Sequence, residues 1–150
     1  MKMLVIPDIH EAPNLAEVED AIAAHSPDLT VFLGDYFDQW GDTPADAGRT
    51  AEWLANSLKL DKRRHLWGNH HLPYYLPGVR ALSCPGWTSR KYQEAKRFMG
   101  EADWQRLTLH HWDGDWLFTH AGWSHSHCPG GLSIAQKQEY LDEQVKLAWS

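Results

Sequence analysis

The stretch VFLGDYFDQWGD, residues 31–42, joins a short apolar run to a group of acids. The run breaks at Gly34, and Asp35 and Asp38 follow just past the break. A continuous apolar run of this length is typical of a strand that is buried on both faces of a sheet. Ligands of α/β proteins collect at the carboxyl ends of strands, so acids at this point indicate a chemical site.

Similar short strands lie on both sides of this stretch in the sequence. Residues 3–6 form a continuous apolar run that Pro7 ends, and HLWGNHH, residues 65–71, contains a third strand that ends at Gly68. Two helices separate the strands, and capping and proline residues mark their limits: Asn14 and Ser26-Pro27 for the first, Thr43-Pro44 for the start of the second. This order predicts an α/β fold with βαβ crossovers.

The second half of the chain is less regular. Residues 72–87 are dense in Pro, Gly and aromatic residues, which predicts a long irregular loop. Further elements are expected in chain order: helices over 89–99 and 101–107, a hairpin around Asp113-Gly114 whose second strand ends at His120, and a last helix that Ser133 and Gln136 cap.

The composition limits the functions open to the chain. Its 150 residues, 43% of them hydrophobic, predict a single domain over residues 1–150. A net charge of −6 provides no attraction to a phosphate backbone, so nucleic acid is not an expected partner. The isolated Cys84 and Cys128 indicate reduced thiols in a cytoplasmic protein. No apolar run approaches the roughly 18 residues that would span a membrane.

Four predicted strands end in turns that carry reactive side chains. A lone Asp or His after a strand is typical of an ordinary turn or a hydrogen-bonded rim residue. Four such turns at the ends of four strands are different, because the sheet would bring them together. The turns are PDIH with Asp8 and His10, GDYFD with Asp35 and Asp38, GNHH with Asn69 and His70, and FTHAG with His120.

This set of motifs resembles the calcineurin-like metallophosphoesterases, and within them the serine/threonine protein phosphatase type. DIH, GDYFDQWG, GNHH and THAG stand in the order of the family's motifs and cover residues 1 to about 123. The combined match is highly specific, although DxH or GNH alone would be weak. The resemblance implies a β-sandwich flanked by helices.

The resemblance also implies roles for the turn residues. Asp35 would bridge two divalent ions, since each carboxylate oxygen can serve one metal; Asp8 and His10 would complete one site, and Asn69 and His120 the other. His70 resembles the general acid that protonates the leaving oxygen, and Asp38 the carboxylate that holds its ring. Mixed oxygen and imidazole ligands favour Mn²⁺, with Fe, Zn²⁺, Co²⁺ or Ni²⁺ as alternatives.

Three positions depart from the phosphatase pattern. Gln39 stands where the family has an arginine that grips the phosphate, and Arg49, Arg80 or Arg90 are candidate replacements. His71 replaces an acid. Members of the family have a further His ligand, later in the chain than the turn that corresponds to THAG. Either His125 or His127 in SHSHCP supplies it, or the last strands are absent and the domain is C-terminally minimal.

Three functions are compatible with these residues. The favoured one is a phosphatase that hydrolyses phosphate monoesters, whether a phosphoprotein, a nucleotide or a small phosphate, with a dinuclear metal centre and metal-activated hydroxide. The alternatives are a phosphodiesterase or nuclease on the same site, and a non-catalytic metal-binding interaction module whose partner surface includes Trp40, Trp87 and Trp123. A phosphorylated substrate is the expected partner, and the sequence sets no oligomeric state.

Overall fold

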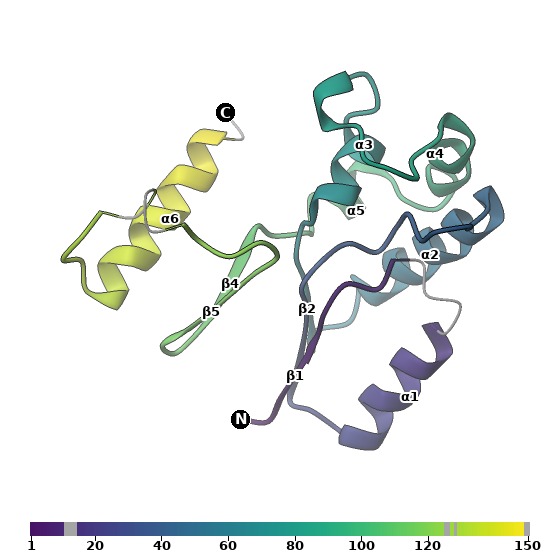
Figure 1. Cartoon of the computed structure of the whole chain (residues 1–150). Helices are drawn as coiled ribbons and strands as arrows, with labels where there is room; N and C mark the ends of the chain where they lie inside the picture. Colours follow the sequence, from purple (N-terminus) through teal and green to yellow (C-terminus); the bar gives the residue numbers. More distant parts are fainter. Residues whose placement is uncertain (11–14, 125–126, 128, 149–150) are drawn as a thin grey trace.

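A three-stranded parallel sheet forms the centre of the fold. The computed structural model of the chain describes residues 1–10, 15–124, 127 and 129–148. Strands β1 (Met3–Ile6), β2 (Leu29–Phe32) and β3 (Arg63–His65) pair in that order, and helices α1 (Leu15–His25) and α2 (Pro44–Ser57) connect them (Figure 1). The predicted α/β class with βαβ crossovers is confirmed.

The strand and helix limits follow largely from the local sequence. All four residues of β2 are buried, as its apolar run predicts. Helix α2 begins as expected: the Thr43 side chain and the Asp46 side chain form a reciprocal capping box around Pro44. Helix α1 ends at His25, just before Ser26-Pro27, whereas its predicted cap Asn14 lies outside the described residues.

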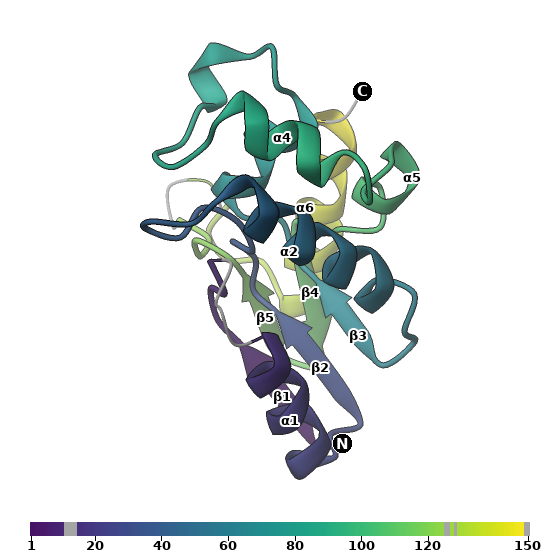
Figure 2. The ribbon, with the colours of Figure 1, turned by 90° about the vertical axis from the view of Figure 1, so that its right-hand side faces the viewer.

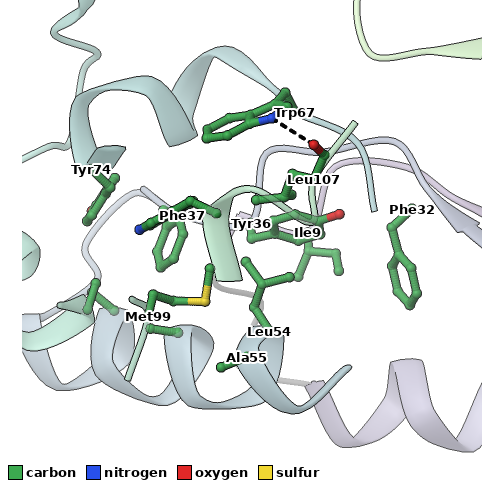
Figure 3. Close-up of a cluster of buried hydrophobic side chains, with 14 residues drawn as sticks. Ile9, Phe32, Tyr36, Phe37, Leu54, Ala55, Trp67, Tyr74, Met99 and Leu107 are labelled. Carbon is green, nitrogen blue, oxygen red and sulfur yellow. Dashed lines mark hydrogen bonds between the residues drawn. The ribbon is translucent and has the colours of Figure 1, made fainter. Parts of the chain in front are cut away.

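The main core is aromatic and lies between α2, the sheet and the segment after β3. Figure 3 shows Phe32, Tyr36, Phe37 and Trp67 gathered over the Leu54 side of α2. The indole N–H of Trp67 donates to the carbonyl of Leu107 at 3.1 Å, so the buried polar edge of this ring is satisfied. The cluster therefore fixes the segments that follow β2 and β3.

The prediction of an irregular loop over 72–87 is wrong in part. This segment contains a short helix, α3 (Leu72–Tyr75), and a 3₁₀ turn, η2 (Arg80–Leu82), and η1 (Asn69–His71) precedes them. Pro73 lies in the first turn of α3, where its missing N–H costs no hydrogen bond, so proline starts a helix here.

Other elements differ from the prediction in length or register. The third strand was expected within 65–71, but β3 covers Arg63–His65, and beyond it only Leu66 bridges to Thr108. Helices α4 (Ser89–Ala95) and α5 (Glu101–Trp104) are shorter than expected. Helix α4 packs against α2, where a Cβ on Gly48 would lie 3.6 Å from Glu94 and Phe98.

The second sheet is a hairpin of β4 (His110–Asp113) and β5 (Trp116–Thr119). Asp113 pairs with Trp116, so the loop is Gly114-Asp115, one residue later than predicted. Ser133 and Gln136 cap α6 (Ile134–Ala148) as expected, through mutual hydrogen bonds between side chain and backbone. Figures 1 and 2 place α1 and α2 on one side of the parallel sheet and the hairpin with α6 on the other.

The two sheets with outer helices agree with the architecture expected from the motifs. Among the described residues, no helix is both long and apolar enough to cross a lipid bilayer. The single domain over residues 1–150 stays a prediction.

Candidate metal centre

The turns after β1 and β2 are joined by backbone hydrogen bonds. The N–H groups of Ile9 and His10 both donate to the carbonyl of Asp35, at 3.0 and 2.8 Å. The backbone φ angle is positive at three residues of these turns: 47° at His10, 47° at Asp35 and 70° at Asp38. Residues other than glycine rarely adopt this region. Such strain persists only where the surroundings impose it, and it is concentrated here in three predicted site residues.

Two glycines allow the turns after β2 and β3 to approach each other. A Cβ on Gly34 would lie 2.9 Å from the Gly68 nitrogen, and one on Gly68 would lie 2.6 Å from the Asp35 nitrogen. Both distances are shorter than real Cβ contacts, so only glycine fits. The close approach lets the His70 N–H donate to Asp35 Oδ1 at 2.9 Å.

The first group of predicted ligands is Asp8, His10 and Asp35. One ligand atom from each lies within 4.8 Å of the others. His10 Nε2 is 3.7 Å from Asp8 Oδ2 and 4.0 Å from Asp35 Oδ2. The Nδ1 of His10 lies 3.0 Å from the carbonyl of Phe37, which only accepts. Nδ1 therefore carries a proton, and in the neutral ring Nε2 is the nitrogen whose lone pair faces the acids.

The second group is Asn69, His120 and the shared Asp35. The Nδ1 of His120 donates to the carbonyl of Leu33 at 3.1 Å, so in the neutral ring Nε2 is the nitrogen with the lone pair. This Nε2 lies 3.2 Å from Asp35 Oδ2 and 3.2 Å from Asn69 Oδ1. When the ring is neutral, three electron-pair donors meet here, an arrangement that a bound cation would stabilise.

Cys84 sets the orientation of the Asn69 amide. The Nδ2 of Asn69 donates to Cys84 Sγ at 3.6 Å, which turns Oδ1 toward His120, and the thiol in turn donates to the Asn69 carbonyl at 3.3 Å. From the sequence, Cys84 was expected only to be a reduced thiol.

His70 and Asp38 form a separate pair beside these ligands. His70 Nδ1 lies 3.1 Å from Asp38 Oδ2, and the Asp38 carboxylate is completely buried. The Asp38 carboxylate at Nδ1 fixes the orientation of the His70 ring, so Nε2 is the nitrogen that can exchange a proton with a substrate. The His70 ring also meets the His10 ring edge-on, with centroids 5.0 Å apart.

Tyr74 and Lys91 hold the Asp38 carboxylate, and neither was predicted from the sequence as a site residue. The Tyr74 hydroxyl donates to Asp38 Oδ1 at 2.8 Å, and Lys91 Nζ lies 3.3 Å from the same oxygen. Lys91 also pairs with Asp42, and its side chain is only 4% exposed. Burial lowers the pKa of Lys91, but the hydrogen bond to Asp42 and the charge of Asp38 outweigh it, so the pKa lies above its usual value.

His71 occupies the position where the phosphatase pattern has an acid. Its ring is fully buried, and the N–H groups of Gly68 and Tyr36 face its two nitrogens at 2.7 and 3.2 Å. Burial holds the pKa of His71 well below its usual value, which keeps the ring neutral. A neutral imidazole has one acceptor nitrogen, so it satisfies one of the two donors, where a carboxylate would accept from both.

The candidate replacements for the missing arginine lie on the surface. Arg49 is 66% exposed and pairs with Asp46, Arg80 is exposed in η2, and Arg90 is exposed in α4. The Gln39 N–H donates to Asp42 at 3.1 Å. Of the two candidate histidines for the further ligand, His127 is exposed and His125 lies outside the described residues, so the choice between them and absent last strands stays open.

The tryptophans proposed for a partner surface differ in their surroundings. Trp40 is fully exposed, whereas Trp123 stacks on Tyr140 with ring centroids 6.2 Å apart. Trp87 is half-buried against the aromatic core.

Comparison with known proteins gives one match. The sequence model of the family described as calcineurin-like phosphoesterase matches residues 1–149. No curated protein and no solved structure shows a significant match to the chain.

Proposed function

We propose, because the chain belongs to the calcineurin-like phosphoesterase family, that it hydrolyses phosphate monoesters at a dinuclear metal centre, as the serine/threonine protein phosphatase type does. Family membership makes the chain a metal-dependent phosphoesterase and a hydrolase. The observation that carries the finer proposal is the meeting of His120 Nε2, Asp35 Oδ2 and Asn69 Oδ1, three ligand atoms of which the first lies 3.2 Å from each of the others.

The residues of both groups fit divalent metals. Asp8 and His10 would hold one ion together with Asp35, and Asn69 and His120 would hold the other. When bound, two such ions would neutralise charge on the phosphoryl group and lower the pKa of a water molecule. The mixed oxygen and imidazole ligands suit Mn²⁺, Fe, Zn²⁺, Co²⁺ or Ni²⁺, and we propose Mn²⁺ as the first candidate.

His70 supports hydrolysis of a monoester rather than metal storage alone. In the proposed step a water oxygen bonds to phosphorus, the ester P–O bond breaks, and its electron pair goes to the alcohol oxygen. His70 donates a proton to that oxygen, and the water supplies the proton that restores His70. A protein that only bound metal would have no chemical need for a histidine held at Nδ1 by the buried Asp38.

The test measures hydrolysis and metal content together. The purified chain is assayed on p-nitrophenyl phosphate and bis(p-nitrophenyl) phosphate with Mn²⁺, Ni²⁺, Co²⁺ and Zn²⁺, and bound Mn²⁺ is counted by elemental analysis. We expect faster turnover of the monoester than of the diester, and two Mn²⁺ ions per chain. Asp35→Asn should lower both the turnover rate and the number of bound ions. Turnover of the diester alone would identify a phosphodiesterase. Metal-dependent thermal stabilisation without turnover of either ester would identify a binding module.

A further inference from the structure

A cavity of about 400 Å³ lies against the second group of predicted ligands. Asn69 and His120 form part of its wall, together with the Ala121-Gly122 turn and the inner face of α6. A second cavity of about 550 Å³ lies under the same helix but includes neither of these ligands. The smaller cavity thus shares two residues with the candidate metal centre, and its volume is within the usual range for small-molecule sites.

The rest of this cavity wall is mainly apolar. Away from Asn69 and His120 its large side chains are Trp67, Leu72, Leu109, Trp123, Leu141 and Val145. Of the other described lining residues, His110 already pairs with Asp142 at 2.9 Å, and Thr119 lies in β5. The cavity wall therefore combines two predicted metal ligands with a largely apolar surface.

A wall with two metal ligands and an otherwise apolar surface favours an amphiphilic ester. A phosphoryl group at the ligands would leave its alcohol part against the apolar wall, where burying each methylene contributes about 0.8 kcal/mol, or about fourfold in affinity. A sugar or a nucleoside would instead bury hydroxyl groups with few partners, which costs free energy. The wall thus selects among monoesters by the polarity of the alcohol.

We propose that the substrates are phosphate monoesters of apolar alkyl alcohols, and that the alkyl chain binds in the cavity between α6 and the turns that carry Asn69 and His120. This inference rests on the proposed monoesterase function and adds the class of alcohol.

The experiment uses ethyl, butyl and hexyl phosphate, because their alcohols leave almost equally well and differ mainly in apolar length. With Mn²⁺ we expect kcat/KM to rise by up to about 16-fold with each added ethylene unit, which brings two methylenes. Leu141→Asn, which places an amide in the cavity wall, should remove most of the rise. Leu147→Asn is the matched control: this leucine is on the same helix, 68% exposed and outside the cavity wall.

A second measurement separates this inference from the proposed function. Calorimetric binding of hexylphosphonate and ethylphosphonate needs no turnover. Tighter binding of the hexyl compound, lost in Leu141→Asn, supports the cavity even if no ester is hydrolysed. Equal binding of the two compounds, or equal kcat/KM for the three esters, would overturn the inference while hydrolysis of p-nitrophenyl phosphate upheld the function.

Discussion

Lys91 Nζ lies 3.3 Å from Asp38 Oδ1, and both side chains are almost completely buried. The two residues are 53 positions apart in the sequence, and helix α4 brings the lysine behind the pair of Asp38 and His70. Asp42 takes a second contact from the same ammonium group. One cation thus holds two buried carboxylates, one of which positions the proposed general acid.

Replacing Lys91 by Met should destabilise the fold and slow catalysis. The change leaves Asp38 and Asp42 buried without their cation, and breaking a buried ion pair costs about 3–5 kcal/mol. We expect the free energy of unfolding in urea to fall by about 3 kcal/mol and kcat to fall at least tenfold, with KM little changed. Lys91→Arg should restore most of kcat, because it keeps the charge.

Lys96 provides the control for that substitution. It follows α4, and its exposed ammonium group lies over the Tyr92 ring. Lys96→Met should therefore change neither stability nor kcat appreciably. If Lys91→Met fails to fold, Asp42→Asn keeps the contact between Lys91 and Asp38 and should retain kcat. Equal kcat in wild type and Lys91→Met would show that the lysine does not position the pair.

Replacing His70 by Asn should slow esters with poor leaving groups the most. A general acid contributes about 10²–10⁴-fold when the leaving oxygen must be protonated, and much less when the leaving group is already stable as an anion. We expect a loss of at least 10²-fold on ethyl phosphate and a smaller loss on p-nitrophenyl phosphate, with unchanged Mn²⁺ content. Equal losses on both esters would contradict the assignment of His70 as acid. His25→Asn, on the exposed end of α1, is the control.

The sequence predicted the ligand turns because their placement depends on a simple rule of topology. Parallel strands end at the same edge of a sheet, so side chains just after β1 and β2 must be neighbours. The grouping of Asp8 with Asp35 thus follows from the sequence alone. His120 joins them from the separate hairpin, so the prediction that one sheet would gather all four turns is wrong for this residue. The order of motifs still pointed to it.

The supporting residues could not be predicted in this way. Tyr74, Cys84 and Lys91 come from residues 72–91, where helices are short and no hydrophobic period marks which side chains face inward. Their contacts join positions far apart in the sequence, and they depend on the path of an irregular segment. His71 was noted only as a missing acid, because nothing in the sequence shows that two backbone donors face its ring.

Replacing Gly68 by Ala should weaken metal binding without removing a ligand. The added Cβ would press on the backbone nitrogen and the carboxylate of Asp35, so the turn after β2 must shift. We expect at least tenfold weaker Mn²⁺ binding by calorimetry. Gly78→Ala is the matched control, since a Cβ there meets nothing within 4 Å. Unchanged affinity in Gly68→Ala would show that the close approach of the two turns is unimportant for the site.

His65 should make the fold less stable as the pH falls below about 6.5. The ring is buried between the Tyr36 hydroxyl at 3.0 Å and the Ser57 hydroxyl at 2.9 Å, and burial, aided by the charge of Arg63, lowers its pKa to about 3. Between the ordinary pKa of about 6.5 and the folded value, the unfolded chain binds a proton that the folded chain does not. Stability therefore falls with decreasing pH across this window, by about 1.4 kcal/mol per pH unit.

Urea unfolding of wild type and His65→Gln between pH 7 and pH 5, with EDTA present to remove metal, measures this contribution. Glutamine does not titrate, so we expect the variant to be less stable than wild type at pH 7 but to lose about 2 kcal/mol less by pH 5. Because the other histidines are common to both proteins, their effects cancel in the difference. Parallel pH curves for the two proteins would show that His65 is protonated equally in the folded and unfolded chains, contrary to its burial between two hydroxyl groups.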